Sequence, residues 1–264
     1  MRSTDAVDRV ARVLDLLADS PDGMGVSEVA DALGVHKATA SRLLGTLAVR
    51  GLVDRTPSRR YRIGVGMVRY AASAVPELGG VSRARPELEA LSAATNETVS
   101  IGVLDGRDVL YIDQVTGSQR VVFADWAGRR SPAHCSSSGK VLLAHLPVDE
   151  LERFLSRGLD ARTERTITDP DEFRDRLEEI RRRGYERTVG ELEEGLSTAA
   201  APIRSRGRVV AAVSVGGPSA RLPARELPRL GKLAIGTARV IGRRLEASGG
   251  DAFEVHDRAH GSAR

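Results

Sequence analysis

Apolar residues recur at helical spacing in the first third of the chain and alternate with polar residues in short runs further on. Residues 5–19 predict a first helix, whose apolar face is formed by Val7, Val10, Leu14 and Leu17. Residues 25–64 carry two short helical patterns around a Gly-Val turn, and then two alternating runs, 52–53 and 61–63, that predict a β-hairpin. Helix, turn, helix and hairpin in this order are typical of a winged helix-turn-helix.

Local end signals agree with these helices. Ser27 stands where the N-cap of the first of the two short helices is expected, just before its apolar positions. Gly34 supplies the flexible residue that favours the end of this helix, and Gly51 is expected to end the next one. The second short helix buries a stripe formed by Ala40, Leu43, Leu44 and Leu47.

A mostly apolar stretch after the hairpin, residues 65–75, predicts a helix that Pro76 stops. It is too short to be a domain, so we interpret it as a linker helix. The predicted organisation is therefore a winged helix-turn-helix at 1–66, a linker helix at 67–80 within a second domain at 67–248, and a disordered tail at 249–264.

The second domain mixes strand and helix patterns. Hairpins with helices grouped between them predict an α+β fold with an antiparallel sheet and helices packed against it. Asp105-Gly106-Arg107 is a hairpin turn, and Asp169-Pro170 is an N-cap followed by proline at the first helical position. The expected strands are 99–104, 109–112, 120–124, 198–204 and 208–215; the expected helices are one entered at Ser82 to Pro86, 138–145, 170–184 and 223–247.

Composition places the chain among globular proteins with room for two modest domains. It has 264 residues, 41% of them hydrophobic and 29% charged, and no apolar run approaches the ~20 residues that would cross a bilayer. The polar N-terminus lacks the apolar core of a signal peptide. Cys135 is the single cysteine, which excludes an internal disulfide. We expect a cytoplasmic protein with no membrane partner.

The net charge of +4 is small, but the charges are unevenly distributed. Residues 34–66 hold seven Lys or Arg against one Asp, whereas residues 1–33 hold three Arg against seven acidic residues. A basic run by itself is most simply a solvated surface. Together with a helix-turn-helix and a wing, it predicts a face that binds double-stranded DNA.

The second helix of the helix-turn-helix leaves basic and hydroxyl side chains on its outward side near its N-terminus. Its basic residues are expected to contact phosphate or base edges, and its hydroxyl residues to act as shorter-range base readers. Wings commonly lie at the minor groove or along the backbone, so the wing arginines are expected to add affinity more than specificity. The predicted DNA-binding residues are Lys37, Thr39, Ser41, Arg42, Arg59 and Arg60.

Three segments of the second domain are candidates for a ligand pocket. Residues 134–140 form a hydroxyl-rich loop that runs into a helix N-terminus, where backbone N–H groups favour an anion. Residues 195–200 and 214–218 place small side chains at strand ends, which leaves space for a bound molecule. Arg129 and Arg130 nearby favour an anionic metabolite. Two simpler interpretations stay open: the serines are only helix caps, and the C-terminal half serves only to dimerise.

Five segments together resemble the isocitrate lyase regulator (IclR) family of bacterial transcriptional regulators, over residues 5 to about 247. They are SEVADALGVHKATASRLLGTLAVRGLV, SIGVLDGRDVLYIDQV, GRRSPAHCSSSGKVLLAHLP, RTITDPDEFRDRLEEIRRRGYERTVGELEEGLSTAAAPI and VVAAVSVGGPSARL. The resemblance implies an N-terminal winged helix-turn-helix, a linker helix and a C-terminal GAF-like effector domain, acting as dimers or pairs of dimers. Family members often repress, and some activate, genes of carbon-source or aromatic catabolism in response to small metabolites, often carboxylates.

This resemblance implies a DNA-binding regulator, expected to be a repressor, whose operator affinity is controlled by an organic acid or other anionic catabolite. A transcriptional activator of the same family is the alternative. The family often has cysteine where Thr198 stands and an acidic residue near Thr188, and some members have a second serine in place of Gly216. No cofactor or metal is expected. The effector-binding residues implied by position are Ser136, Ser137, Ser138, Thr198, Ser214 and Gly216.

Short motifs that suggest an enzyme lack the partners they need. Ser137 and Lys140 match the Ser-x-x-Lys motif, but the Ser-Asp-Asn and Lys-Thr-Gly elements of penicillin-binding enzymes are missing from the sequence. His134 beside Cys135 has no partner motif for a metal site, which favours a structural pair. A Ser- or Cys-dependent enzyme is therefore the least favoured alternative, with no catalytic residue expected. A solvated turn is the favoured interpretation of the acidic cluster Glu191, Glu193 and Glu194.

Overall fold

The computed structural model describes residues 5–74, 79–118 and 126–247. The chain divides into two compact units, Met1–Pro76 and Glu77–Arg264, and each has its own hydrophobic core. The domain boundaries expected at residues 66 and 248 stay predictions, and so does the linker assignment of residues 67–80.

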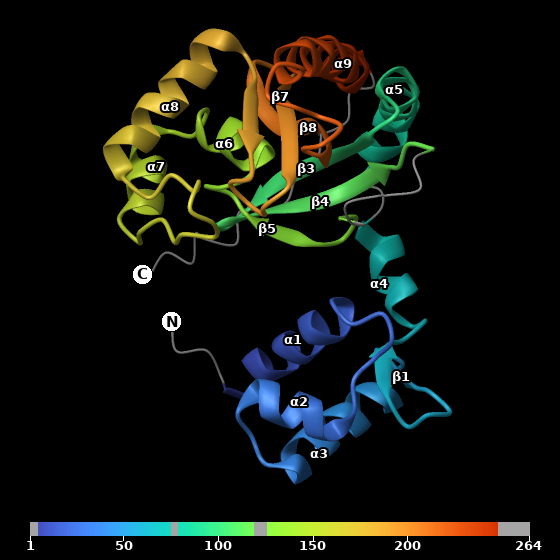
Figure 1. The fold of residues 1–264 in the computed structure, drawn as a ribbon. Coiled ribbons are helices and arrows are strands. Elements are labelled where there is room, and N and C mark those ends of the chain that lie inside the picture. The colour runs from blue at the N-terminus through green and yellow to red at the C-terminus, as the bar shows by residue number, and fades with distance from the viewer. Residues whose placement is uncertain (1–4, 75–78, 119–125, 248–264) are drawn as a thin grey trace. The chain divides into compact units, whose positions relative to one another are not determined.

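The N-terminal unit confirms the predicted winged helix-turn-helix (Figure 1). Its first three helices and the hairpin share a core that contains Val13, Val29, Leu44 and Tyr61. The predicted core position Val7 is instead 66% exposed, because the face of the first helix that contacts the unit runs through Val13 and Leu17. The elements are α1 (Asp5–Ala18), α2 (Val26–Leu33), α3 (Lys37–Val49), β1 (Val53–Arg55), β2 (Tyr61–Ile63) and α4 (Met67–Ala74).

The predicted cap of α2 is wrong by two residues. Gly25 is the N-cap, and its backbone N–H donates to the Glu28 carboxylate at 2.6 Å. Since Glu28 reaches back to this amide, Ser27 lies inside the helix instead of before it. This hydrogen bond lowers the pKa of Glu28, with a smaller contribution from the Arg60 guanidinium. Gly34 ends α2 in the left-handed region with φ 65°, as its sequence position predicts.

The C-terminal unit is built on a six-stranded antiparallel sheet in the order β5-β4-β3-β8-β7-β6 (Figure 1). The predicted α+β fold with helices against an antiparallel sheet is confirmed. The strands are β3 (Thr98–Asp105), β4 (Asp108–Val115), β5 (Arg130–Pro132), β6 (Glu186–Val189), β7 (Leu196–Ser205) and β8 (Arg208–Pro218). The helices are α5 (Gly79–Thr95), α6 (Ser137–Leu143), α7 (Val148–Leu155), α8 (Pro170–Arg183) and α9 (Leu227–Ala247).

The two faces of this sheet differ in character, because alternate residues of a strand point to opposite faces. Val99, Ile101 and Val213 belong to the core shared with α5 and α9. Ala200 and Ala212 face the other way and join the core of α6, α7 and α8. Positions of the same alternation near one end of the sheet are polar, and this end holds the pocket described below.

Several elements of this unit were not anticipated from the sequence. The short strands β5 and β6 and the helix α7 are present, and Pro86 lies inside α5 instead of at its entry. The edge strands β5 and β6 are only three and four residues long, so their alternation carries little signal. The strand expected at 120–124 falls outside the described residues. Asp169 caps α8 and Gly184 ends it, as predicted.

Candidate DNA-binding face and effector pocket

Helix α3 divides its side chains between core and solvent. Ala40 and Leu44 are fully buried, which turns the opposite side of the helix outward. Lys37, Ser41 and Arg42 are exposed, whereas Thr39 is half-buried. Two of the predicted base or phosphate contacts are therefore cationic side chains on the outward side of the first turns of this helix.

The wing turn carries Arg59 in a backbone conformation that arginine rarely adopts. Its φ is 63°, in the left-handed region. The turn is closed by the Arg59 N–H donating to the Thr56 carbonyl at 2.9 Å and by the Thr56 N–H donating to the Arg60 carbonyl at 2.8 Å. The Arg59 side chain is exposed at the tip.

Arg60 is placed differently from Arg59. Its guanidinium donates to the Gly23 carbonyl at 2.7 Å and makes an ion pair with Glu28 at 3.1 Å. These contacts tie the wing to the loop before α2 and to the first turn of α2. Arg60 thus orients the wing, and a contact with phosphate would require it to share or leave these partners.

Five of the six predicted effector residues lie around one pocket. Ser138, the sixth, is fully buried and is not among the residues that line it. The effector role of all six stays a prediction. The pocket is lined by Thr98, Ser100, Tyr111, Trp126, Ser136, Ser137, Thr188, Leu192, Leu196, Thr198, Ser214 and Gly216.

Sheet register explains why hydroxyl groups from distant parts of the chain form one wall. Thr188 pairs with Thr198, Thr198 with Gly216, and Gly216 with Thr98, which makes a row across β6, β7, β8 and β3. Two residues along the strands, Ser214 pairs with Ser100 in the same way. Residues two apart on a strand share a face, so both rows point into the pocket.

Gly216, which has no side chain, leaves space in this wall. A Cβ at this position would come within 2.9 Å of the Thr198 Cγ2. The glycine therefore leaves open the space between the threonine side chains on either side of it in the row.

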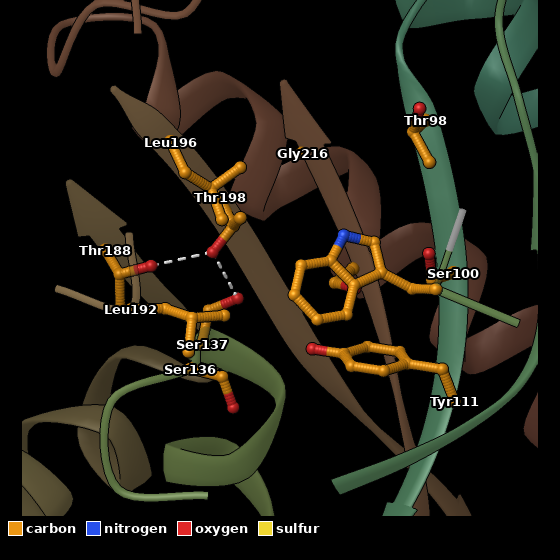
Figure 2. Close-up of a pocket in the computed structure, with 12 residues that line it drawn as sticks. Thr98, Ser100, Tyr111, Ser136, Ser137, Thr188, Leu192, Leu196, Thr198 and Gly216 are labelled. Atoms are coloured by element: carbon orange, nitrogen blue, oxygen red, sulfur yellow. Dashed lines mark hydrogen bonds between the residues drawn. The ribbon is translucent and has the colours of Figure 1, made fainter. Parts of the chain in front are cut away.

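A chain of hydroxyl groups joins the sheet to the N-terminus of α6 (Figure 2). The Thr198 hydroxyl lies 2.7 Å from that of Thr188 and donates to the Ser137 hydroxyl at 2.6 Å. Ser136 is the N-cap of α6, and its Oγ accepts from the Gly139 N–H at 3.2 Å. Hydroxyl groups both donate and accept, so this wall can bind a carboxylate, a phenol or a carbonyl.

Two aromatic rings form another side of the pocket. Tyr111 and Trp126 lie with ring centroids 5.6 Å apart and planes tilted by 51°. Gln114 holds the second ring in place, since its side-chain oxygen accepts from the Trp126 backbone N–H at 3.0 Å. Burial raises the pKa of Tyr111, which keeps its phenol neutral. Aromatic faces beside a hydroxyl wall suit a flat ligand with polar ends.

Seven of the twelve lining residues are not among the effector-binding residues expected from the sequence. Thr98 and Ser100 had a signal, because they are polar positions that alternate with Val99 and Ile101 in a buried strand. Leu196 lies within the candidate segment 195–200, and the family resemblance points to the neighbourhood of Thr188. Tyr111, Trp126 and Leu192 had no sequence signal, since only the fold brings them to the pocket.

The interpretation of Glu191 as part of a solvated turn is wrong. Its side chain is 8% exposed and forms an ion pair with Lys140, which is fully buried. Glu193 and Glu194 are exposed, as expected. The pairing also occupies the ammonium of the Ser-x-x-Lys match.

His134 and Cys135 form structural contacts, as the sequence indicated. The His134 Nε2 lies 2.7 Å from the Asp160 carbonyl, and burial lowers the pKa of this histidine. Burial raises the pKa of Cys135 to about 12, so the thiol stays protonated at neutral pH and is a poor nucleophile. Within residues 5–74, 79–118 and 126–247, no cluster of three or more His, Cys, Asp or Glu is arranged to hold a metal ion. No helix in these ranges combines the length and apolarity of a membrane span.

The family model for the bacterial transcriptional regulator IclR C-terminal domain matches residues 72–243, and that for the IclR helix-turn-helix domain matches residues 6–57. The HTH-type transcriptional regulator BhcR of Paracoccus denitrificans is 35% identical over 239 residues, which is 89% of this chain and 85% of the relative.

Two solved structures have the same fold over nearly the whole chain. An IclR homolog from Microbacterium hydrocarbonoxydans, complexed with 4-hydroxybenzoate, is 27% identical with a TM-score of 0.80 and covers 92% of this chain and 99% of its own. The Agobacterium tumefaciens repressor BlcR is 27% identical with a TM-score of 0.59 and covers 93% and 99%.

The fold and these matches define a transcriptional regulator with a DNA-binding unit and an effector-binding unit. The chain belongs to the IclR family. Its relatives are regulators, and the chain is not an enzyme.

Proposed function

We propose that this regulator is a repressor whose affinity for operator DNA is set by a small aromatic or similarly flat organic acid bound in the C-terminal unit. The observation that carries the proposal is the pocket, in which a hydroxyl wall faces two aromatic rings. The relative crystallised with 4-hydroxybenzoate has the same fold, and the relative BlcR is itself a repressor. Both facts support the proposal by similarity.

The acid would be recognised by neutral groups. Arg130 is paired with Asp105 at 2.6 Å, and neither Arg129 nor Arg130 is among the residues that line the pocket. Among the residues that the structure describes, those that line the pocket include no charged side chain. A carboxylate would therefore accept hydrogen bonds from the Ser136 and Ser137 hydroxyls, and hydrogen bonds to a charged acceptor are the stronger kind.

DNA binding would use the outward side of α3 and the tip of the wing. Lys37, Ser41 and Arg42 are exposed on α3, and Arg59 is exposed on the wing. Thr39 is half-buried and would contact a base only at the edge of the interface, while Arg60 would act mainly by orienting the wing.

We further propose at least a homodimer, acting in the cytoplasm, because two-fold symmetric regulators read two half-sites. Exposed apolar side chains beside the wing support self-association: Val65 is 76% and Val68 63% exposed.

The effector hypothesis predicts selective binding of aromatic acids. We expect 4-hydroxybenzoate or another benzoate from a panel to bind more tightly than its neutral amide, and Ser137→Ala to weaken that binding about 10-fold, the loss of one charge-assisted hydrogen bond. Trp126 is the single tryptophan and lines the pocket, so its fluorescence reports binding without a label. Calorimetry gives the affinities.

The control for this series is Ser156→Ala, because the Ser156 hydroxyl donates to the Arg153 carbonyl on α7 and does not line the pocket. Selective binding of the amides, with no loss on Ser137→Ala, would contradict an acidic effector. In a promoter-reporter assay, effector-induced expression supports a repressor, whereas effector-dependent activation from an unrepressed promoter supports the activator alternative.

The role of Arg59 in DNA binding can be tested with a substitution that changes the stability of the N-terminal unit and its DNA affinity in opposite directions. Because Arg59 is held at φ 63°, Arg59→Gly should stabilise the N-terminal unit by about 1 kcal/mol while removing a cation from the DNA face. We expect operator affinity to fall about fivefold and its salt dependence to become less steep. Thermal unfolding and fluorescence anisotropy measure the two effects. A more stable variant with unchanged DNA affinity would exclude Arg59 from the interface.

A further inference from the structure

We propose that Lys140 and Glu191 are positioning residues that fix the loop between β6 and β7, residues 190–195, so that Leu192 closes the effector pocket. This inference deepens the proposed function, since it concerns the same pocket. Neither residue lines the pocket itself. Their role is to connect two of its walls.

The connection starts in α6. This helix brings Ser136 and Ser137 to the pocket at its N-terminus, and Lys140 follows one turn later. The Lys140 side chain is fully buried, and its Nζ contacts the Glu191 carboxylate. Lys140 is one of three lysines in the whole sequence, and the other two, Lys37 and Lys232, are exposed.

On the other side, Glu191 stands directly before Leu192 at the start of the loop. Leu192 lines the pocket, and so do Thr188 and Leu196 at the ends of the flanking strands. Figure 2 shows Leu192 beside Thr188 and the α6 serines. A shift of Glu191 would therefore move a side chain that closes the pocket.

Two threonines hold the same short stretch of backbone. The Thr163 hydroxyl donates to the Gly190 carbonyl at 2.6 Å, and the Thr166 hydroxyl donates to the Glu191 carbonyl at 2.7 Å. The two threonines thus bind the backbone at the start of the loop, while Lys140 binds the Glu191 carboxylate. The exposed half of the loop, Glu193 to Gly195, lies beyond these contacts.

Charge chemistry makes the ion pair a positional device more than a source of stability. Removing two charges from water costs about as much as their attraction returns, so an apolar pair of equal size would be equally stable. The Lys140 ammonium is buried away from water, so it must stay next to the Glu191 carboxylate. Two apolar side chains could instead slide past one another at little cost. The pair therefore fixes where the loop sits relative to α6.

The test uses the full-length protein without any ligand. Lys140→Met removes the charge at similar volume, and Lys140→Met with Glu191→Leu replaces the pair by an apolar one. Hydrogen exchange by mass spectrometry follows residues 190–195 and, separately, α9 as a reporter of the whole unit. Acrylamide quenching of Trp126, which lines the same pocket as Leu192, reports how open the pocket is.

We expect Lys140→Met to accelerate exchange in residues 190–195 on the order of 10-fold beyond any change in α9, and to raise the quenching of Trp126. In the double variant, hydrogen exchange in α9 should return to the wild-type rate, while exchange in residues 190–195 should remain accelerated. Glu87→Gln, which breaks the ion pair of α5 with Arg244 of α9, is the matched control and should leave the loop unchanged.

Two results would overturn the inference. One is equal acceleration of the loop and α9 in Lys140→Met, which indicates global destabilisation only. The other is full recovery of loop protection in the double variant, which shows that any buried pair suffices. Failure of aromatic acids to bind the wild-type protein would contradict the proposed function and would leave this measurement valid.

Discussion

Replacing Gly139 with alanine is expected to destabilise the C-terminal unit by about 3 kcal/mol, the upper part of the usual range for overpacking. Gly139 lies in the first turn of α6, against the backbone of Ala133. A Cβ at this position would overlap the Ala133 carbonyl group. Because neither backbone segment has a flexible end to move aside, α6 would have to shift away from Ala133, the residue that follows β5.

The same shift would displace Ser136 and Ser137, so effector binding should fail even where the variant folds. Urea unfolding followed by Trp126 fluorescence measures the loss, since the single tryptophan lies in the C-terminal unit. The matched control is Gly236→Ala in α9, where a Cβ meets nothing within 4 Å. This substitution should stabilise the unit by about 1 kcal/mol, because alanine favours a helix interior. Equal effects of the two substitutions would contradict the packing argument.

Replacing Arg42 with alanine is expected to weaken binding to an operator by about 2 kcal/mol, or roughly 30-fold. Arg42 is exposed one turn into α3, beside Lys37 and Ser41 on the outward side. An arginine that reads a guanine edge confers sequence preference, whereas one that contacts phosphate affects all sequences alike. The effect of the substitution on sequence preference therefore also shows whether Arg42 contacts a base or a phosphate.

The operator for this measurement can be selected by the wild-type protein from a random oligonucleotide pool. Fluorescence anisotropy at several salt concentrations then gives affinity and salt dependence. If Arg42 contacts a phosphate, the slope of log affinity against log salt concentration should fall in magnitude by about 1, with unchanged sequence preference. Arg239→Ala, an exposed arginine on α9, is the control and should bind DNA like the wild type. Unchanged affinity in both variants would place the DNA face elsewhere.

The N-terminal unit was largely predictable because its signals are local. The stripe of Ala40, Leu44 and Leu47 and the Gly34 end of α2 are read within one or two helical turns. The error at the α2 cap has a local cause as well. Two local signals compete to define the start of α2: Ser27, a favoured N-cap residue before an apolar run, and Glu28, whose carboxylate accepts from the Gly25 N–H. The sequence does not decide between them.

The pocket was predictable only in part, and the limit has a physical cause. The hydroxyl loop before α6 stands out in the sequence, but Thr98, Thr188 and Gly216 become neighbours only through sheet register. Leu196 and Tyr111 look like ordinary core residues. Glu191 looked solvated because two acidic residues follow it closely, and its buried partner lies 51 positions away in the sequence.

The sequence by itself determined the winged helix-turn-helix, the basic outward side of α3 and the antiparallel α+β unit, because helix spacing, caps and hairpin turns act over short stretches. Tertiary structure decided which residues share the pocket, that Arg60 orients the wing while Arg59 remains exposed, and that Lys140 is buried against Glu191. These outcomes depend on which strands pair and which side chains lose water. Both follow from the packing of segments that are far apart in the chain.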